Sequence, residues 1–292
     1  MNNFMSSYEI ILKVLNEICD KQNFIRQIRK PKLSDLELIA LNLTAEYSSI
    51  DSESQLFRKL PEAITNKIER SVYNRRKRKL AFAMEKIRQK LSRFFNEYED
   101  YYIVDSMPLE VVKLARSSRS KICKEKYETA PDMGYSASQK MYFYGYKLHA
   151  VASVNGIIQS FDLTKASTHD IRYLTDIKYQ FSDCVIIGDK GYLNAEYQLD
   201  LFTSNNIKLE VPMRANQHNY KKQASIFRRT RKRIETIFSQ LCDQFMIRRN
   251  YAKTFDGFRT RIISKITSFT IIQYINKFIY NRNINNVKIN IA

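Results

Sequence analysis

The chain has 292 residues, of which 44% are hydrophobic, so it can bury one large core or two modest ones. It carries 49 Lys and Arg residues against 30 Asp and Glu residues, which gives a formal net charge of +19. So many positive side chains repel one another in the isolated protein, which favours binding to a polyanionic partner. The longest uncharged apolar run, residues 266–276, is far shorter than the roughly 20 residues that a membrane span needs. The composition thus argues against an integral membrane protein.

The N-terminal sequence MNNFMSSYEI lacks a basic start followed by an apolar segment, so we expect a cytoplasmic protein. The four cysteines are far apart and show no CxxC spacing. We expect them to be free thiols rather than zinc ligands or disulfide partners.

The first hundred residues predict helices and no strand. Apolar residues keep a helical spacing over residues 8–18, and Ser34 with Glu37 forms a capping-box pattern at the start of a second helix. A long helix with an apolar stripe follows at residues 80–94, and its leading turns are the basic residues 75–79. The N-terminal domain is therefore predicted to be all-α.

Short helices followed by a helix that opens with basic residues are typical of a helix-turn-helix-like DNA-binding domain. We place such a domain at residues 1–100, with Arg75, Arg76 and Arg78 as candidate DNA contacts. A solvated basic face on an ordinary helical bundle explains the same charges. Charge alone leaves both interpretations open.

The pattern changes at Tyr101, after the acid-rich segment 96–100. The segments 142–154 and 157–163 flank Asn155-Gly156, which predicts a hairpin with a type I′ turn. The other predicted strands are 101–104, 184–187 and 207–211, and the predicted helices begin after 167–170, near 195–204 and around Glu235. A hairpin followed by alternating strands and helices predicts an α/β domain, a mixed sheet flanked by helices, which we place at residues 101–250.

Two further segments complete this expectation. Residues 106–140 are basic and polar without periodicity, which indicates an active-site loop or a small insertion. Residues 255–280 predict another apolar helix, followed by an Asn-rich, frayed end. We expect residues 251–292 to pack on the sheet domain or to extend it.

Two aspartates stand where apolar strand-like runs end. Asp105 follows YYIV and Asp189 follows VIIG. Because ligand-binding groups collect at the carboxyl ends of strands in open sheets, the two carboxylates can meet at one metal. Carboxylates are the oxygen ligands that Mg²⁺ prefers, and pairs of Mg²⁺ ions drive in-line phosphoryl displacement. For each aspartate alone, capping of a turn is the favoured explanation.

Glu235 is the only acid between Val211 and Cys242, a stretch with eight Lys or Arg residues. Arg228 and Arg231 precede it by seven and four residues and share its helical face. One acid and two arginines facing a cleft could place a metal ligand beside phosphate clamps. On spacing alone, a salt bridge on a solvated helix is the favoured explanation for Glu235.

Taken together, five stretches resemble the transposases of bacterial insertion sequences, of the type that uses two Asp and one Glu on a ribonuclease H-like core. The stretches are IVDSMPLEV, YGYKLHAVASVNGIIQSFDLTKASTHD, VIIGDKGYLN, RRTRKRIETIF, and the N-terminal KLSDLELIALNLTAEYSSIDSESQLFRKL with SVYNRRKRK. The N-terminal pair resembles more narrowly the insertion sequence 982 family. The resemblance covers almost the whole chain.

The resemblance implies that Asp105, Asp189 and Glu235 are the catalytic, metal-holding residues. Two Mg²⁺ ions, or Mn²⁺ as a substitute, would activate the attacking hydroxyl and stabilise the leaving 3′-oxygen. The same site would cut a strand at the element's end and join the freed 3′-OH to target DNA. No covalent link between protein and DNA is implied.

The resemblance also implies how DNA is held. The family's Tyr, Arg, Glu, Lys signature matches only at Arg231 and Glu235, because Arg228 and Cys242 stand at its first and last positions. The candidate DNA- or phosphate-binding residues of the sheet domain are Arg231, Arg228, Lys190 and Lys147. The implied partners are double-stranded DNA, as terminal inverted repeats and as target, and further copies of the chain in a homodimer or larger assembly.

Two alternatives stay open at this point. A metal-dependent nuclease with the same ribonuclease H-like fold would use the same carboxylates without strand transfer. A catalytically inactive DNA-binding protein derived from a transposase would keep the basic helices alone, and the intact Asp105, Asp189 and Glu235 argue against it.

Overall fold

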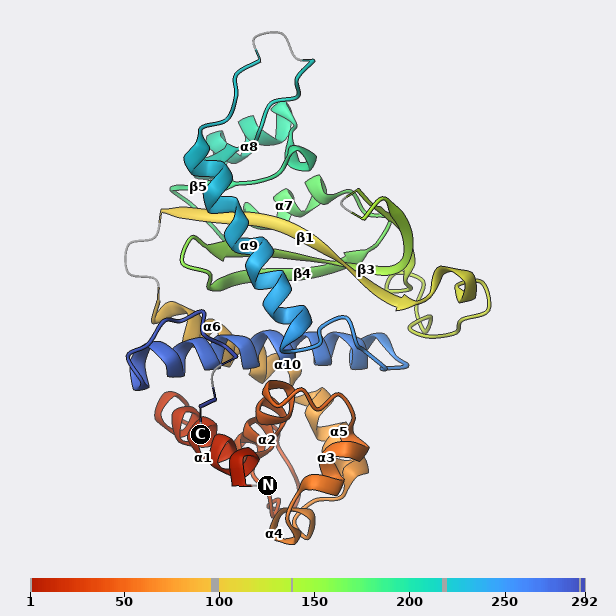
Figure 1. Cartoon of the computed structure of the whole chain (residues 1–292). Coiled ribbons are helices and arrows are strands. Elements are labelled where there is room, and N and C mark those ends of the chain that lie inside the picture. Colours follow the sequence, from red (N-terminus) through yellow and green to blue (C-terminus); the bar gives the residue numbers. More distant parts are fainter. Residues whose placement is uncertain (1, 96–99, 138, 217–219, 289, 292) are drawn as a thin grey trace. The chain divides into compact units, whose positions relative to one another are not determined.

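The structure is a computed structural model that describes residues 2–95, 100–137, 139–216, 220–288 and 290–291 (Figure 1). Contacts within the chain divide it into two compact units. We call Met1–Phe95 with Gln240–Ala292 the helical unit, and Asn96–Ser239 the sheet unit. The acid-rich boundary predicted at 96–100 lies mostly outside the described residues.

The helical unit combines segments from both ends of the sequence. Its elements are α1 (Asn2–Ile18), α2 (Asp35–Tyr47), α3 (Glu53–Lys59), α4 (Glu62–Thr65), α5 (Arg70–Lys79), α6 (Ala81–Arg93), α10 (Phe255–Tyr274) and the π-helical turn η4 (Ile275–Ile279). The predicted capping box is confirmed, since Ser34 accepts from the Glu37 N–H and Glu37 accepts from the Ser34 N–H.

Helix α10 is buried on nearly all sides and packs against α2, α5 and α6. Its apolar side chains fill the core of the helical unit, and its buried hydroxyls find partners within that unit. Ser264 accepts from the Asn42 amide at 2.7 Å, and Ser268 donates to the Leu43 carbonyl at 2.8 Å. The predicted apolar helix is thus present, but it joins the N-terminal helices rather than the sheet.

This grouping differs from the expected boundaries. Contacts end the first segment of the helical unit at residue 95 and begin its second at residue 240, whereas the sequence suggested boundaries at 100 and 250. The C-terminal residues 240–292 are grouped with the N-terminal helices because their apolar side chains pack there. Helix α9 (Ser225–Asp243) begins in the sheet unit and ends in the helical unit.

The single long helix predicted around residues 75–94 is wrong, because Leu80 separates α5 from α6. Leu80 caps both helices and is fully buried. The break lets α5 contact α2 and α3 while α6 packs along α10. At the end of the stripe, Phe95 is buried and Phe94 is 44% exposed, so the apolar face ends one residue later than predicted.

The sheet unit contains a mixed six-stranded sheet with the order β2-β3-β1-β5-β6, in which β4 also pairs with β3. Its strands are β1 (Tyr101–Val112), β2 (Asp132–Ser136), β3 (Met141–Ser153), β4 (Ile158–Lys165), β5 (Cys184–Ile187) and β6 (Ile207–Glu210). Strands β1, β5 and β6 are parallel, and β3 runs antiparallel to β1, β2 and β4. The predicted mixed sheet is confirmed.

The predicted hairpin is confirmed, but its turn is of another kind. Gly156 N–H bonds to the Ser153 carbonyl at 2.9 Å, and Ser153 N–H bonds to the Ile157 carbonyl at 2.9 Å. Gly156 has φ of 100°, whereas Asn155 is not among the residues with positive φ. A type I turn followed by a left-handed glycine gives this three-residue loop, in place of the two-residue type I′ turn.

Residues 106–140 are more ordered than the expected loop. Strand β1 continues to Val112, η1 (Leu114–Arg116) follows, and β2 pairs with the beginning of β3. A loop remains at residues 117–131. The predicted insertion is therefore partly an extension of the sheet.

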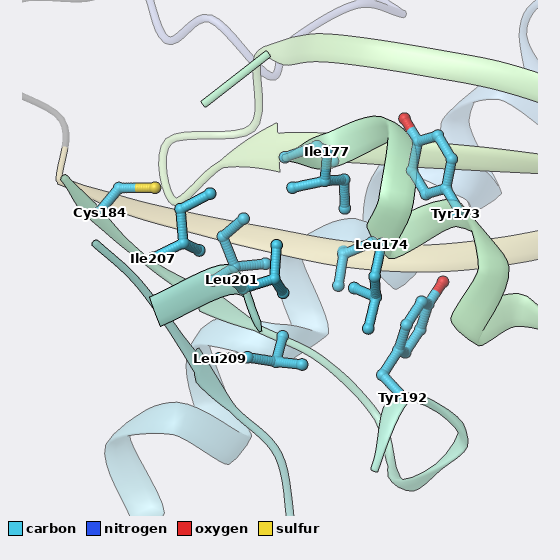
Figure 2. Packing of buried hydrophobic residues seen from close by; sticks show 11 residues of the cluster. Tyr173, Leu174, Ile177, Cys184, Tyr192, Leu201, Ile207 and Leu209 are labelled. Carbon is cyan, nitrogen blue, oxygen red and sulfur yellow. The ribbon is translucent and has the colours of Figure 1, made fainter. Parts of the chain in front are cut away.

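Helices α7 (Tyr173–Ile177) and α8 (Ala195–Asn205) cover one face of the sheet (Figure 2). Leu174 and Ile177 of α7 and Leu201 of α8 are buried against the strand residues Ile186 and Ile207. The short 3₁₀ turn η2 (Asp170–Arg172) precedes α7 and is capped by His169, whose side chain accepts from the Ile171 N–H. The same core includes Val104 of β1 and Ile186 of β5, so it holds these two strands in place.

Two smaller expectations concern the whole chain. All four cysteines are free. Within the described ranges, no helix combines the length and the apolar character that crossing a bilayer requires.

Candidate active site

Two aspartates lie side by side because of the parallel pairing of β1 with β5. The register places Ile103 opposite Ile187. Two residues further along, each chain segment reaches an aspartate, Asp105 within β1 and Asp189 just after β5. The position of Asp189 at a strand end is as predicted. Asp105 is not at a strand end, because β1 continues for seven residues beyond it, to Val112.

Backbone N–H groups hold one oxygen of each aspartate. The Ser106 N–H donates to Asp105 Oδ1 at 2.8 Å, and the Lys190 N–H donates to Asp189 Oδ1 at 2.6 Å. The Oδ2 atoms of both carboxylates are turned toward a side chain of α9. Each aspartate is therefore oriented by its own strand or turn, with one oxygen left for an outside partner.

That side chain is Arg231, which lies one helical turn before Glu235. Its Nη1 is 3.9 Å from Asp105 Oδ2 and 3.7 Å from Asp189 Oδ2, and its Nη2 is 3.5 Å from Glu235 Oε1. The buried stripe of α9, which includes Ile234 and Phe238, fixes the orientation of this face. The structure thus brings the three predicted carboxylates and the predicted arginine into one cluster.

The cluster occupies the sheet face opposite to α7 and α8. Side chains alternate along a strand, and Val104 belongs to the buried core under α7 and α8. Asp105 therefore faces the other side, together with Ile103, and Ser106 returns to the α7 side. The hydrogen bond from Ser106 Oγ to Asp170 Oδ1, 3.0 Å long and made to the η2 turn, agrees with this placement.

Burial sets the electrostatics of the cluster. The side chain of Asp105 is 22% exposed, against 49% for Asp189 and 54% for Glu235. Burial raises the pKa of Asp105 to about 6, although the Ser106 N–H and Arg231 oppose the increase. Asp105 is thus the carboxylate whose charge most needs a positive partner.

Asp170 is a further acid near the site, where the sequence indicated only the start of a helix. It accepts from Ser106 Oγ and from Lys147 Nζ, the latter at 3.1 Å. Lys147 also donates to the Thr168 carbonyl at 2.9 Å. Register places Lys147 opposite Pro108, on the α7 face, so this predicted phosphate contact lies on the other side of the sheet from Arg231. Because Ser106, Lys147 and Asp170 come from separate parts of the sequence, no local pattern indicates these hydrogen bonds.

His149 lies on the same face and is fully buried. Its Nε2 is 2.8 Å from Thr164 Oγ1, and its ring stacks on Tyr173 with centroids 4.9 Å apart. Burial lowers the pKa of His149 to about 4, with Asp170 opposing and Lys147 adding to the decrease. A neutral packing role fits these contacts.

Acid is therefore expected to destabilise the sheet unit through His149. The unfolded chain protonates this histidine near pH 6.5, whereas the folded protein does so only near pH 4. Between these values the unfolded state binds more protons, so the free energy of unfolding falls as the pH falls, by on the order of 1 to 3 kcal/mol. Urea unfolding at pH 8 and pH 5 should show a smaller pH effect in His149→Gln than in the wild type. Equal pH effects in the two proteins would contradict this account.

The remaining predicted DNA contacts divide into exposed and buried side chains. Arg228 and Lys190 are exposed in the sheet unit, and Arg75 and Arg78 are exposed on α5. Arg76 is 91% buried by contrast with its neighbours, and its Nη2 donates to the fully buried Asp35 at 2.6 Å. In this conformation Arg76 stabilises the helical unit and is not available to DNA.

The three carboxylates are of the kind that binds a divalent cation, but here the positive group that they face is the guanidinium of Arg231. Among the described residues, no group of three or more His, Cys, Asp or Glu side chains is arranged to hold a metal ion. The Oδ2 atoms of Asp105 and Asp189 nevertheless converge on one positive group, as oxygen ligands do around Mg²⁺. The donor set therefore fits such an ion provided that Arg231 moves.

Comparison with known families agrees with this site. The model of the transposase DDE domain matches residues 99–271, which is more than half of the chain, and the chain belongs to this family. The match includes Asp105, Asp189, Arg231 and Glu235.

One solved structure is similar to the chain only at low sequence identity. A Mos1 transposase paired-end complex with the left transposon end is similar to this chain at 11% sequence identity, covering 81% of this chain and 84% of that one, with a TM-score of 0.25. At this TM-score no feature of the site is inferred from it. No curated protein matches the chain.

Proposed function

We propose that the chain is the transposase of an insertion sequence, of the 982 family, and that it cuts the ends of its element and joins them to target DNA. The observation that carries the proposal is the convergence of Asp105, Asp189 and Glu235 on one cation in a chain of the DDE transposase family. The net charge of +19 supports a DNA partner.

In this proposal Asp105, Asp189 and Glu235 hold Mg²⁺, or Mn²⁺ in its place, through their carboxylate oxygens. When bound, a pair of such ions activates the attacking oxygen and stabilises the leaving 3′-oxygen. The chain's own residues position the DNA. Arg231, Arg228 and Lys190 lie on or beside the cluster and would bind backbone phosphates, because guanidinium and ammonium groups form charge-assisted hydrogen bonds with them.

The helical unit is proposed to bind the terminal inverted repeats. The exposed Arg75 and Arg78 of α5 would make the phosphate contacts there, with Arg76 holding α5 in place through Asp35. Because both ends of an element are joined in one reaction, we propose a homodimer or larger assembly on DNA, acting in the cytoplasm.

The test is cleavage of a labelled duplex that carries the inverted repeat flanking the gene, with Mg²⁺ or Mn²⁺ and at matched salt. Wild-type protein is expected to nick the repeat boundary and, given a pre-cut 3′-OH end, to join it to a second duplex. Asp189→Ala is expected to do neither. Cutting without joining would favour the nuclease alternative, and binding without cutting in either metal would favour an inactive DNA-binding protein.

A further inference from the structure

Arg231 occupies the place between the carboxylates where a divalent cation would be expected. Its two terminal nitrogens face three acids that come from three parts of the chain, at 3.5 to 3.9 Å. The oxygens they face on Asp105 and Asp189 are the Oδ2 atoms, while the Oδ1 atoms bond backbone N–H groups. Arg231 thus takes the oxygens that a shared metal ion needs.

The guanidinium is held by charge and not by short hydrogen bonds. Hydrogen bonds from nitrogen to oxygen are about 2.7 to 3.2 Å long. All three distances to Arg231 exceed this range. The side chain is also 26% exposed, so it has a path to solvent or to a ligand. An arginine held in this way balances the negative charges without being locked in place.

Arg231 in this position and a divalent ion at the same oxygens exclude one another. Mg²⁺ binds oxygen at about 2.0 to 2.1 Å, so an ion shared by Asp105 and Asp189 would lie against the guanidinium. Two cations at such a distance repel strongly in a partly buried site. Metal binding therefore requires that Arg231 move away, and another anion that receives its guanidinium would favour the move.

A DNA phosphate is an anion of the right kind, since arginine binds phosphate oxygens with two parallel hydrogen bonds. We propose, on the basis of the proposed function, that Arg231 stands in for the metal in the DNA-free protein and that a backbone phosphate draws it off the carboxylates. Arg231 is then a positioning residue that couples DNA binding to metal binding. By linkage, DNA raises the metal affinity and metal raises the DNA affinity by the same factor.

The competing account makes Arg231 a phosphate clamp with no influence on the metal. The two accounts differ in the protein without DNA. If Arg231 competes with the metal, then its removal strengthens metal binding. If it only clamps phosphate, then its removal leaves metal binding unchanged.

The experiment is titration of the full-length protein with Mn²⁺, followed by calorimetry, in the wild type, Arg231→Gln and Arg229→Gln. Arg229 is an exposed arginine of the same helix and bonds Ser225. Arg229→Gln is a matched control, because it removes the same charge as Arg231→Gln. Without DNA, Arg231→Gln is expected to bind Mn²⁺ about tenfold more tightly than the wild type, and Arg229→Gln within about twofold of it. Unchanged or weaker binding by folded Arg231→Gln overturns the inference.

A second measurement has one arm in the wild type alone, and that arm does not depend on how the variant folds. A short duplex at saturating concentration is expected to tighten Mn²⁺ binding about tenfold in the wild type and much less in Arg231→Gln. Equal tightening in both proteins, or none in the wild type, overturns the inference. Asp189→Ala separates this result from the wider proposal. If Asp189→Ala no longer binds Mn²⁺ but Arg231→Gln binds it as the wild type does, then only the inference fails. If Asp189→Ala still binds Mn²⁺ as the wild type does, then the proposed function loses its support.

Discussion

Replacing Asp105 by Asn is expected to lower metal-dependent strand cleavage on the order of a thousandfold or more while the sheet unit stays folded. The amide keeps the shape of the carboxylate and an oxygen that can accept from the Ser106 N–H. It removes the negative charge that faces Arg231 Nη1 and that would bind the metal. Loss of activity would therefore report the chemistry and not the fold.

The same substitution is not expected to destabilise the protein. Burial raises the pKa of Asp105 to about 6, which means that the folded surroundings disfavour its ionised form. At pH 7.5 a neutral Asn avoids this cost, so the melting temperature of the metal-free protein should stay the same or rise. A melting temperature several degrees lower would contradict this argument.

The control for Asp105→Asn is Glu196→Gln, which removes one negative charge at an exposed position of α8. It is expected to keep cleavage within about twofold of the wild type, since surface charges away from a site have small effects. Cleavage by Asp105→Asn at a rate close to that of this control would remove Asp105 from the proposed active site.

Local patterns predicted the first part of β1, the strands β3 to β6 and the position of Asp189 at a strand end, whereas β2 was not predicted. Strand β5 is an uninterrupted apolar run, and Asp189 directly follows its end. The second half of β1 was missed because residues 106–140, taken together, are basic and polar without periodicity. The strand tolerates Pro108 because β5 pairs with β1 only at Tyr101–Ile103, so beyond that point one edge of β1 needs no N–H donors. The remaining β1 residues still pair with β3.

Partners brought together from distant parts of the sequence could not be predicted from charge or periodicity. Arg76 looked like its exposed neighbours, yet it bonds Asp35 in another helix. Lys147 is turned to the α7 face by strand alternation and meets Asp170 there. The position of Arg231 between the carboxylates depends on the parallel register of β1 and β5, which no local pattern encodes. The helical spacing of Arg231 and Glu235 was visible in the sequence, but the contacts of Arg231 with Asp105 and Asp189 were not.

The largest expected effect on stability concerns an ion pair in the core of the helical unit. Lys265 of α10 donates to Glu46 Oε2 of α2 at 2.5 Å and to the Phe245 carbonyl at 2.7 Å. The side chains are only 1% and 4% exposed. Burial lowers the pKa of Lys265, while Glu46 opposes the decrease. The lysine therefore joins three segments of the unit at one buried charge.

Lys265→Met is expected to lower the free energy of unfolding by about 3 to 5 kcal/mol, because it leaves Glu46 buried without its partner. The double substitution Glu46→Leu with Lys265→Met removes both charges and should recover most of the loss, since a buried ion pair replaced by apolar side chains is often neutral. Urea unfolding followed by circular dichroism measures both effects.

Lys67→Met is the matched control in the same unit, because Lys67 pairs with Glu37 at 3.8 Å with 45% of its side chain exposed. An exposed pair is worth less than about 1 kcal/mol, so this variant should unfold nearly as the wild type does. A double variant as unstable as Lys265→Met alone would contradict the explanation by an uncompensated charge. It would show instead that loss of the hydrogen bond from Lys265 to the Phe245 carbonyl, which neither variant can form, causes the lower stability.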